Sequence, residues 1–295
     1  MFTFLKAPSI LGLRATGVEC LADVLLEEGL DTLDLSAQCV AVETLNHLYN
    51  ADRDADGMIN AAALRDFSIR LSDALSPVLQ GNTFPVVLGG DCSILLGIML
   101  ALKKSGNYGL VTFDGHADFY LPSQSPTGEA ADMDIALVTG RGPDTLTNIE
   151  GRRPYVHDVQ VIHIGQRDEQ ETLQYGSLEI SQTKIHCYPL EKILSLGLQQ
   201  TADQIISDMQ QLSADGFWIH LDTDVIRDDE NPAVDYRIPG GLCISCCERL
   251  IDALLASRRI TGLSVSIYNP KLDPDRKVGK RLAMLLKNVL SKLVV

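Results

Sequence analysis

The sequence predicts an α/β protein with a mostly parallel central sheet that is covered by helices on both faces. Short apolar runs rich in β-branched or aromatic residues alternate with longer segments in which apolar residues recur at helical spacing. Acidic or glycine-rich turns follow several of these runs, which is typical of sheets that bind ligands beyond the carboxyl ends of their strands. No repeat or linker divides the sequence, so we expect one domain over residues 1–295.

The expected strands are short apolar runs that end at a polar or glycine-containing turn. Helical segments rather than tight turns separate them, and strands connected in this way run parallel. In chain order, the expected strands cover residues 3–7, 84–88, 109–113, 159–164, 217–221 and 262–267.

The expected helices have apolar residues three or four positions apart, so that each helix has one apolar face. The clearest example is the last one, where the apolar stripe consists of Val278, Leu282, Leu285, Leu286, Val289, Leu290 and Leu293. The other expected helices cover residues 18–30, 40–49, 64–79, 92–102, 201–212 and 246–256. Residues 120–154 are too many for a simple connection and are expected to form an active-site loop.

The composition favours a protein that acts on a small molecule. Hydrophobic residues make up 45% of the sequence and charged residues 22%, as in ordinary globular proteins. The net charge of −14 disfavours nucleic acid and anionic membranes as partners and suits a cationic or neutral substrate. No apolar run is long enough to span a bilayer, and the first residues resemble a strand more than a signal peptide. The seven cysteines are therefore expected to be reduced, and the protein to be cytoplasmic.

Two short runs of metal-binding residue types stand at the ends of expected strands. They are Asp114-Gly115-His116-Ala117-Asp118 and Asp222-Thr223-Asp224. Alternate residues at a strand end point the same way, so the side chains of each run can converge on one point. Four clustered carboxylates would repel one another and resist desolvation unless a cation lay between them. The pattern therefore predicts a carboxylate-rich site for divalent metal ions, with two metals.

Two other patterns that suggest metal binding are expected to be structural. Residues 52–60 match the first nine positions of an EF-hand calcium loop, but Ala63 stands where the closing glutamate is required. Cys243, Cys246 and Cys247 lack a second Cys or His pair at workable spacing for zinc. We expect these cysteines to pack at the start of a helix.

Two histidines lie within expected strands. His220 shares strand parity with Asp222 but lies deeper in the strand, so a hydrogen-bonded core histidine is favoured over a metal ligand. His163 is in the middle of an apolar run and is expected in the core.

A glycine-rich turn precedes the two acidic runs, and further short motifs accompany them in order along the chain. The motifs are Leu11-Gly12, Gly17-Val18-Glu19, Gly89-Gly90-Asp91-Cys92-Ser93, Asp114 to Asp118, Ile164-Gly165-Gln166-Arg167-Asp168, Leu221-Asp222-Thr223-Asp224, Pro239-Gly240-Gly241-Leu242 and Asn269-Pro270. Together they resemble the signatures of the arginase/agmatinase (ureohydrolase) family over nearly the whole chain.

This resemblance implies a three-layer α/β/α fold and a homo-oligomer, either a trimer or a hexamer. It also implies two Mn(II) ions bridged by a hydroxide that attacks the carbon of a guanidino group. By the same resemblance, Asp114 and Asp222 bridge both metals, and His116 and Asp224 complete the shell of one. Asp118 binds the other metal and holds the hydroxide by a hydrogen bond. Oxygen ligands with one imidazole also suit Mn(II) on chemical grounds.

The sequence departs from the family pattern at several positions. Cys92 stands where the family has a histidine ligand, and we expect it to bind metal through a softer thiolate that shifts preference towards Zn or Ni. Ile267 replaces the glutamate that grips the guanidinium, and Ala131 aligns with the histidine credited with proton shuttling. Either Glu129 or Asp132 is expected to replace that histidine.

The family recognises the amino-acid end of arginine with a carboxylate, and the corresponding position of this sequence is near Gln170. The expected substrate is therefore not arginine. The main prediction is a binuclear metal hydrolase that cuts a C–N bond in another guanidino or amidino substrate. Two alternatives stay open: a catalytically impaired relative with a structural or regulatory role, and a single-metal amidohydrolase similar to the deacetylases. Retention of all five residues in the two acidic runs favours catalysis, because mutually repelling acids are costly without a metal.

Overall fold

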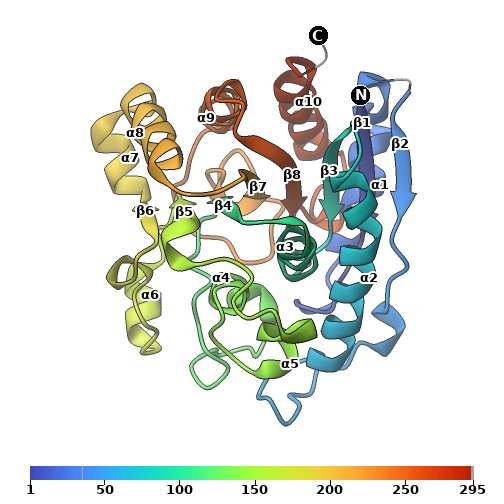
Figure 1. The fold of residues 1–295 in the computed structure, drawn as a ribbon, viewed down its shortest axis with the longest axis vertical. Helices are drawn as coiled ribbons and strands as arrows, with labels where there is room; N and C mark the ends of the chain where they lie inside the picture. The colour runs from blue at the N-terminus through green and yellow to red at the C-terminus, as the bar shows by residue number, and fades with distance from the viewer. Residues whose placement is uncertain (35, 294–295) are drawn as a thin grey trace.

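The computed structural model describes residues 1–34 and 36–293 as one sheet between two layers of helices (Figure 1). In this part of the chain, eight strands lie in the order β2-β1-β3-β8-β7-β4-β5-β6. Every neighbouring pair of strands is parallel. The sheet confirms the predicted α/β class and its three-layer arrangement.

All six predicted strands are present. The central ones are buried on both faces of the sheet, which explains why they appear in the sequence as continuous apolar runs. The strands are β1 (Phe2–Ala7), β2 (Gln38–Ala41), β3 (Phe84–Gly89), β4 (Tyr108–Phe113), β5 (Val161–Ile164), β6 (His186–Tyr188), β7 (Gly216–Asp222) and β8 (Ile260–Ser266).

Each face of the sheet is covered by its own set of helices, and each set packs an apolar stripe against the strands. One set consists of α1 (Leu21–Glu27), α7 (Leu190–Leu196), α8 (Leu198–Gln211), α9 (Ile244–Ala256) and α10 (Lys277–Ser291). The other consists of α2 (Ala61–Leu79), α3 (Ile94–Ser105), α4 (Asp134–Val138) and α5 (Asp144–Thr147). A short helix, α6 (Glu169–Gln174), follows β5. None of the helices in the described ranges is long and apolar enough to cross a membrane.

One expected element is wrong and another is only partly correct. Residues 40–49 do not form a helix: β2 is the edge strand of the sheet and pairs with β1, and the β-branched Val40 lies opposite Leu5. This pairing provides hydrogen-bond partners for backbone groups of β1 that would otherwise be free. No local sequence pattern reveals the pairing. The expected loop over residues 120–154 contains the helices α4 and α5, and the buried side chains of α4 pack in the core.

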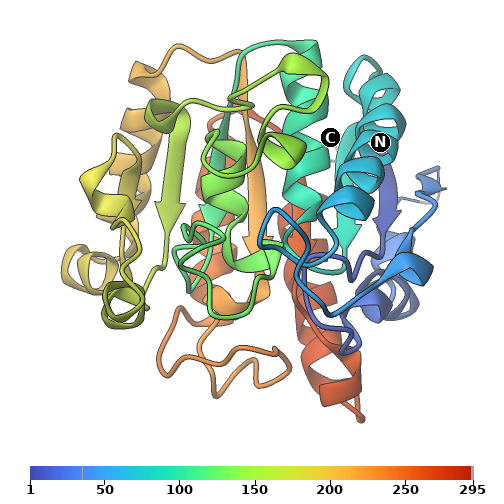
Figure 2. The same ribbon diagram turned by 90° about the horizontal axis from the view of Figure 1, so that it is seen from below.

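The carboxyl ends of the strands lie along one edge of the sheet, and the arrowheads in Figure 2 point towards it. Gly90, just after β3, brings this edge into close contact with the segment that follows β1. A Cβ atom at this position would lie only 1.9 Å from the backbone oxygen of Ser9. Glycine is therefore required here, and the tight turn places Cys92 at the start of α3.

Candidate metal centre

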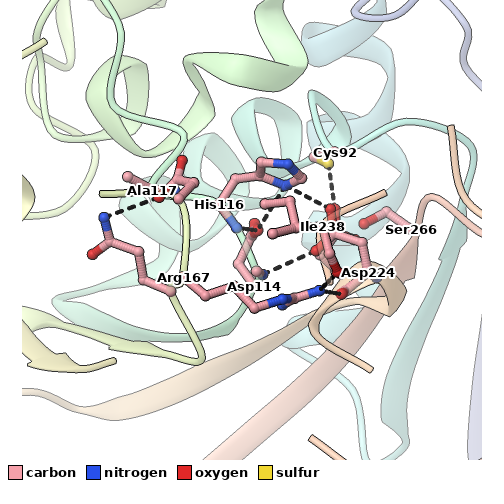
Figure 3. Close-up of polar contacts among 12 residues, drawn as sticks. Cys92, Asp114, His116, Ala117, Arg167, Asp224, Ile238 and Ser266 are labelled. Carbon is pink, nitrogen blue, oxygen red and sulfur yellow. Dashed lines mark hydrogen bonds and ion pairs between the residues drawn. The ribbon is translucent and has the colours of Figure 1, made fainter. Parts of the chain in front are cut away.

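The two acidic runs meet because their strands are neighbours. β4 and β7 pair in register, with Phe113 opposite Leu221, so the residue after each of these lies at the same edge of the sheet. The two runs are also joined directly, since the backbone N–H of Gly115 donates to Asp224 Oδ1 at 2.9 Å. This arrangement brings the predicted ligands together, as Figure 3 shows for Asp114 and Asp224.

Five of the six predicted ligands form two groups that share one member. Donor atoms of Asp114, His116 and Asp118 lie within 4.8 Å of one another, and so do those of Asp114, Asp222 and Asp224. Asp118 has a backbone φ of 45°, which turns the chain back towards the other acids. Asp114 Oδ2 is buried and has no hydrogen-bond partner in the described chain. A donor that belongs to both groups and has a free oxygen is well suited to bridging two cations.

The charges of this cluster are unbalanced. Burial raises the pKa of Asp114, Asp118 and Asp222 well above the ordinary value, and the neighbouring carboxylates raise it further. Asp224 differs: burial acts to raise its pKa, but the nearby His116 lowers it overall. The His116 Nδ1 lies 2.8 Å from Asp224 Oδ2.

The imidazole of His116 is likewise held in its charged form. Burial would lower its pKa, but the Asp224 charge and hydrogen bond outweigh this and raise it to about 9. One imidazolium cannot offset four carboxylates, so the donor set fits divalent cations, which would displace the imidazolium proton.

Cys92 lies beside these acids. Its side chain is buried, and its Sγ donates to Asp222 Oδ2 at 2.7 Å, the contact that a dashed line marks in Figure 3. Burial raises the pKa of the thiol well above its ordinary value, and the negative charge of Asp222 adds to the effect. A bound cation would reverse that balance and favour the thiolate that metal binding requires.

The two predicted proton-transfer residues have different surroundings. Glu129 is held by two hydrogen bonds, from the Arg14 backbone N–H at 3.0 Å and from the Tyr236 hydroxyl at 2.8 Å. Asp132 accepts from the hydroxyls of Ser125 and Thr127 with one oxygen, and its other oxygen has no partner in the described chain. Burial raises the pKa of Asp132 to about 7. Asp132 is therefore the better placed of the two for proton transfer near neutral pH.

A cavity of about 100 Å³ opens onto the metal centre. Three of the residues that depart from the family pattern, Cys92, Ala131 and Ile267, line it. The acidic residues of its lining are Asp118, Glu129, Asp132, Asp168, Glu171, Asp222, Asp224 and Asp235, and no Lys or Arg is among its described lining residues. Gln170 is exposed on α6 and does not line it.

The other candidate metal patterns behave largely as expected. In the segment 52–60, the carboxylate of Asp54 accepts hydrogen bonds from the backbone N–H groups of Asp56, Met58 and Ala61, as in a structural turn. His220 is buried and lies 2.7 Å from Ser264 Oγ through Nδ1.

The cysteines at the start of α9 require a correction. Cys243 and Cys246 form a disulfide bond, whereas all seven cysteines were expected to be reduced. Their spacing of three residues at a helix N-terminus brings the sulfur atoms together. Cys247 is buried in the core and free, so packing at the helix start is confirmed for this residue.

Asp134 is a buried acid of this region that the sequence patterns did not reveal. It begins α4, is fully buried, and lies close to Cys92 and His220. The available signal was an acid inside the apolar segment from Met133 to Val138. That signal was hidden because the segment was expected to be an irregular loop.

Comparison with known proteins gives one family and one fold. The model of the arginase family matches residues 27–293. An arginase of Staphylococcus aureus is 26% identical over 293 residues, covering 95% of this chain and 93% of the relative. The crystal structure of arginase from Bacillus cereus is similar with a TM-score of 0.85 at 22% identity, covering 98% of this chain and 97% of that chain. A formimidoylglutamase of Bacillus subtilis has the same fold, with a TM-score of 0.75 at 14% identity over 99% of this chain and 87% of its own.

Proposed function

The chain belongs to the arginase family, and on this premise we propose that it is a metal-dependent hydrolase of a guanidino or amidino C–N bond. One observation chiefly supports the proposal. Asp114 belongs to both donor groups, has an unpartnered buried oxygen in the described chain, and lies among acids that line a cavity. The arginases and the formimidoylglutamase to which the chain is similar are named for reactions at groups of this kind.

The chain's own residues would hold two divalent cations. By resemblance to the family, Asp114 and Asp222 would be shared, His116 and Asp224 would bind one ion and Asp118 the other, although His116 and Asp118 also lie in one donor group with Asp114. Bound there, the cations would lower the pKa of a water molecule and polarise the substrate. The oxygen-rich donor set favours Mn(II). Arg167 holds the backbone of Asp224 in position, because its guanidinium donates a hydrogen bond to the Asp224 backbone oxygen at 2.7 Å.

The cavity lining favours a substrate other than arginine. A carboxylate on the substrate would find no cationic side chain among the described lining residues, whereas a cationic tail would meet acids such as Glu171 and Asp235. Ile267 places an apolar side chain beside the metal centre, so a carboxylate that holds the guanidino group would have to come from the other acids of the lining, such as Asp168. We therefore propose an amine-bearing substrate without an α-carboxylate.

A release assay for urea and ammonia tests this function. Manganese-loaded protein is expected to hydrolyse agmatine faster than arginine or guanidinobutyrate, because only agmatine combines a cationic tail with no carboxylate. The matched control is the same protein after removal of metal with a chelator, which is expected to be inactive. If the metal-loaded protein is silent on guanidino amines, guanidino acids and formimidoyl compounds, the proposal is wrong.

Asp132 is the proposed proton-transfer residue. It lines the cavity, has one free oxygen, and has its pKa raised by burial to about 7. A carboxyl group with a pKa near neutrality can accept a proton from water and return it to a leaving amine. Glu129 is the less suitable alternative, because both of its oxygens already accept hydrogen bonds.

Two substitutions test this role. Asp132→Asn is expected to lower kcat by roughly 100-fold or more, since general acid–base groups contribute on that order or above. Ser125→Ala removes a hydrogen bond that holds the pKa of Asp132 down, so the inflection of the pH–rate profile should move to higher pH. The measurement is kcat as a function of pH. An unchanged inflection in Ser125→Ala, or full activity in Asp132→Asn, would exclude Asp132 from proton transfer.

A further inference from the structure

Asp134 lies where an acid should not be stable alone. Its side chain is fully buried, and neither carboxylate oxygen accepts a well-aligned hydrogen bond in the described chain. The adjacent backbone N–H of Ile135 is directed to the backbone oxygen of Asp118 instead. A buried carboxylate without a partner is costly, so this position calls for either a proton or a cation.

Two further donors point to a cation. Cys92 Sγ, one oxygen of Asp134 and one ring nitrogen of His220 all lie within 4.8 Å of one another. The three residues are buried and come from separate elements, at the start of α3, at the start of α4 and in the middle of β7. Their convergence requires the packing of α3 against α4 over the sheet, so the cluster is built by the tertiary fold.

The imidazole of His220 is suited to binding a metal. In its neutral form the ring has one N–H and one nitrogen with a lone pair. Its Nδ1 lies 2.7 Å from Ser264 Oγ, and its Nε2 lies 3.2 Å from Ser266 Oγ. One serine hydroxyl can accept the ring N–H and fix the tautomer, and a bound metal ion would replace the serine contact of the other nitrogen.

We propose that Cys92, Asp134 and His220 bind a zinc ion in a buried site next to the carboxylate centre. Thiolate, imidazole and carboxylate together form a donor set that zinc accepts, while the oxygen-rich centre beside it suits Mn(II). In this proposal Cys92 binds the zinc ion and not a cation held by Asp114 and His116. It does not depend on the proposed function, because a buried zinc of this kind stabilises the fold whether or not the protein is a hydrolase.

Cobalt(II) substituted for zinc gives a direct readout of the sulfur ligand, because a thiolate bound to Co(II) produces a charge-transfer band in the near ultraviolet. The intact protein is expected to show this band and to bind zinc in the presence of saturating manganese. Asp134→Ala and His220→Ala should each lose the band and about one equivalent of zinc, although Cys92 is still present. Cys247→Ala is the matched control, since it removes another buried free thiol outside the cluster and should keep the band.

Thermal unfolding shows whether a variant has lost the site or the fold. Zinc should raise the Tm of the intact protein and of Cys247→Ala but not that of Asp134→Ala. In metal-free protein, Asp134→Ala should unfold at a higher temperature than the intact chain, because an unpartnered acid has been removed.

A cobalt–sulfur band that survives in Asp134→Ala and His220→Ala but disappears in Cys92→Ala would overturn the proposal, because Cys92 would then bind a metal ion of the carboxylate centre. Asp114→Asn separates the two proposals: it should abolish hydrolysis and leave the cobalt–sulfur band unchanged.

Discussion

Asp118→Asn is expected to abolish hydrolysis and, at the same time, to stabilise the metal-free protein. Asp118 is buried, lines the cavity and belongs to a donor group with Asp114 and His116. Loss of a residue that only orients a metal ligand already costs roughly 10–100-fold, so loss of a direct ligand should lower kcat by more than about 100-fold. The amide of Asn keeps the shape of the side chain but removes one of the mutually repelling charges.

The stability change distinguishes a lost ligand from a damaged fold. Asp134, Asp222 and Asp224 all act to raise the pKa of Asp118, so its charge is unfavourable in the absence of metal. Urea denaturation should therefore give metal-free Asp118→Asn a higher free energy of unfolding than the metal-free parent chain. Asp203→Asn, an exposed change on α8, is the control and should alter neither kcat nor stability. A variant of Asp118 with normal turnover would remove this residue from the metal centre.

The convergence of the two acidic runs was predictable from the sequence because they follow strands that neighbour each other. A buried apolar run followed by alternating acids fixes the local geometry of Asp114 and Asp222, and parallel packing of β4 against β7 brings the two runs together. Register in a doubly covered sheet is strongly constrained, since a shift of one residue would turn the acids away. Local pattern and tertiary structure therefore agree at this site.

The buried cluster around Asp134 could not be predicted in the same way. Its members come from two helix starts and a strand interior, and no short motif joins them. His220 is buried and hydrogen-bonded, as the sequence predicts, but the proximity of its ring to Cys92, on which the proposed zinc site depends, follows from how α3 lies on the sheet. The strand β2 escaped prediction for a related reason, because its exposed residues acquire strand structure only by pairing with β1. The disulfide between Cys243 and Cys246 likewise follows from helix-start geometry rather than from cysteine number.

The largest stability effect is expected on metal removal at alkaline pH. In the metal-free protein the pKa values of Asp114, Asp118 and Asp222 are raised by burial, and Asp224 raises that of His116 to about 9 against an ordinary 6.5. Each of these groups binds its proton more tightly in the folded chain than in the unfolded chain. The free energy of unfolding then falls as pH rises, because the folded chain must give up protons that the unfolded chain has already lost.

The pH window follows from the groups that act in the opposite direction. Burial lowers the pKa of His163 to about 4 and of His220 to about 3. As pH falls below about 6.5, these histidines bind protons in the unfolded chain before they do so in the folded chain, and the free energy of unfolding decreases. Asp224, with its lowered pKa, adds a similar loss only below about 4. The ordinary histidine pKa of 6.5 and the His116 pKa of about 9 bound the pH window. Within it, none of His163, His220 and Asp224 opposes the fall in the free energy of unfolding. The stability of the metal-free protein should therefore fall throughout this window.

Each extra proton held by the folded chain corresponds to a loss of about 1.4 kcal/mol per pH unit. Urea denaturation of chelator-treated protein at several pH values across the window measures that slope. Manganese-loaded protein should show a smaller slope, because bound cations keep the carboxylates of the cluster ionised and hold His116 neutral in the folded state. Asp114→Asn should reduce the slope of the metal-free protein, since it removes one titrating group and one source of repulsion from the cluster. A metal-free protein whose stability is constant across the window would show that these acids are ionised without a cation, and the physical case for the metal centre would fail.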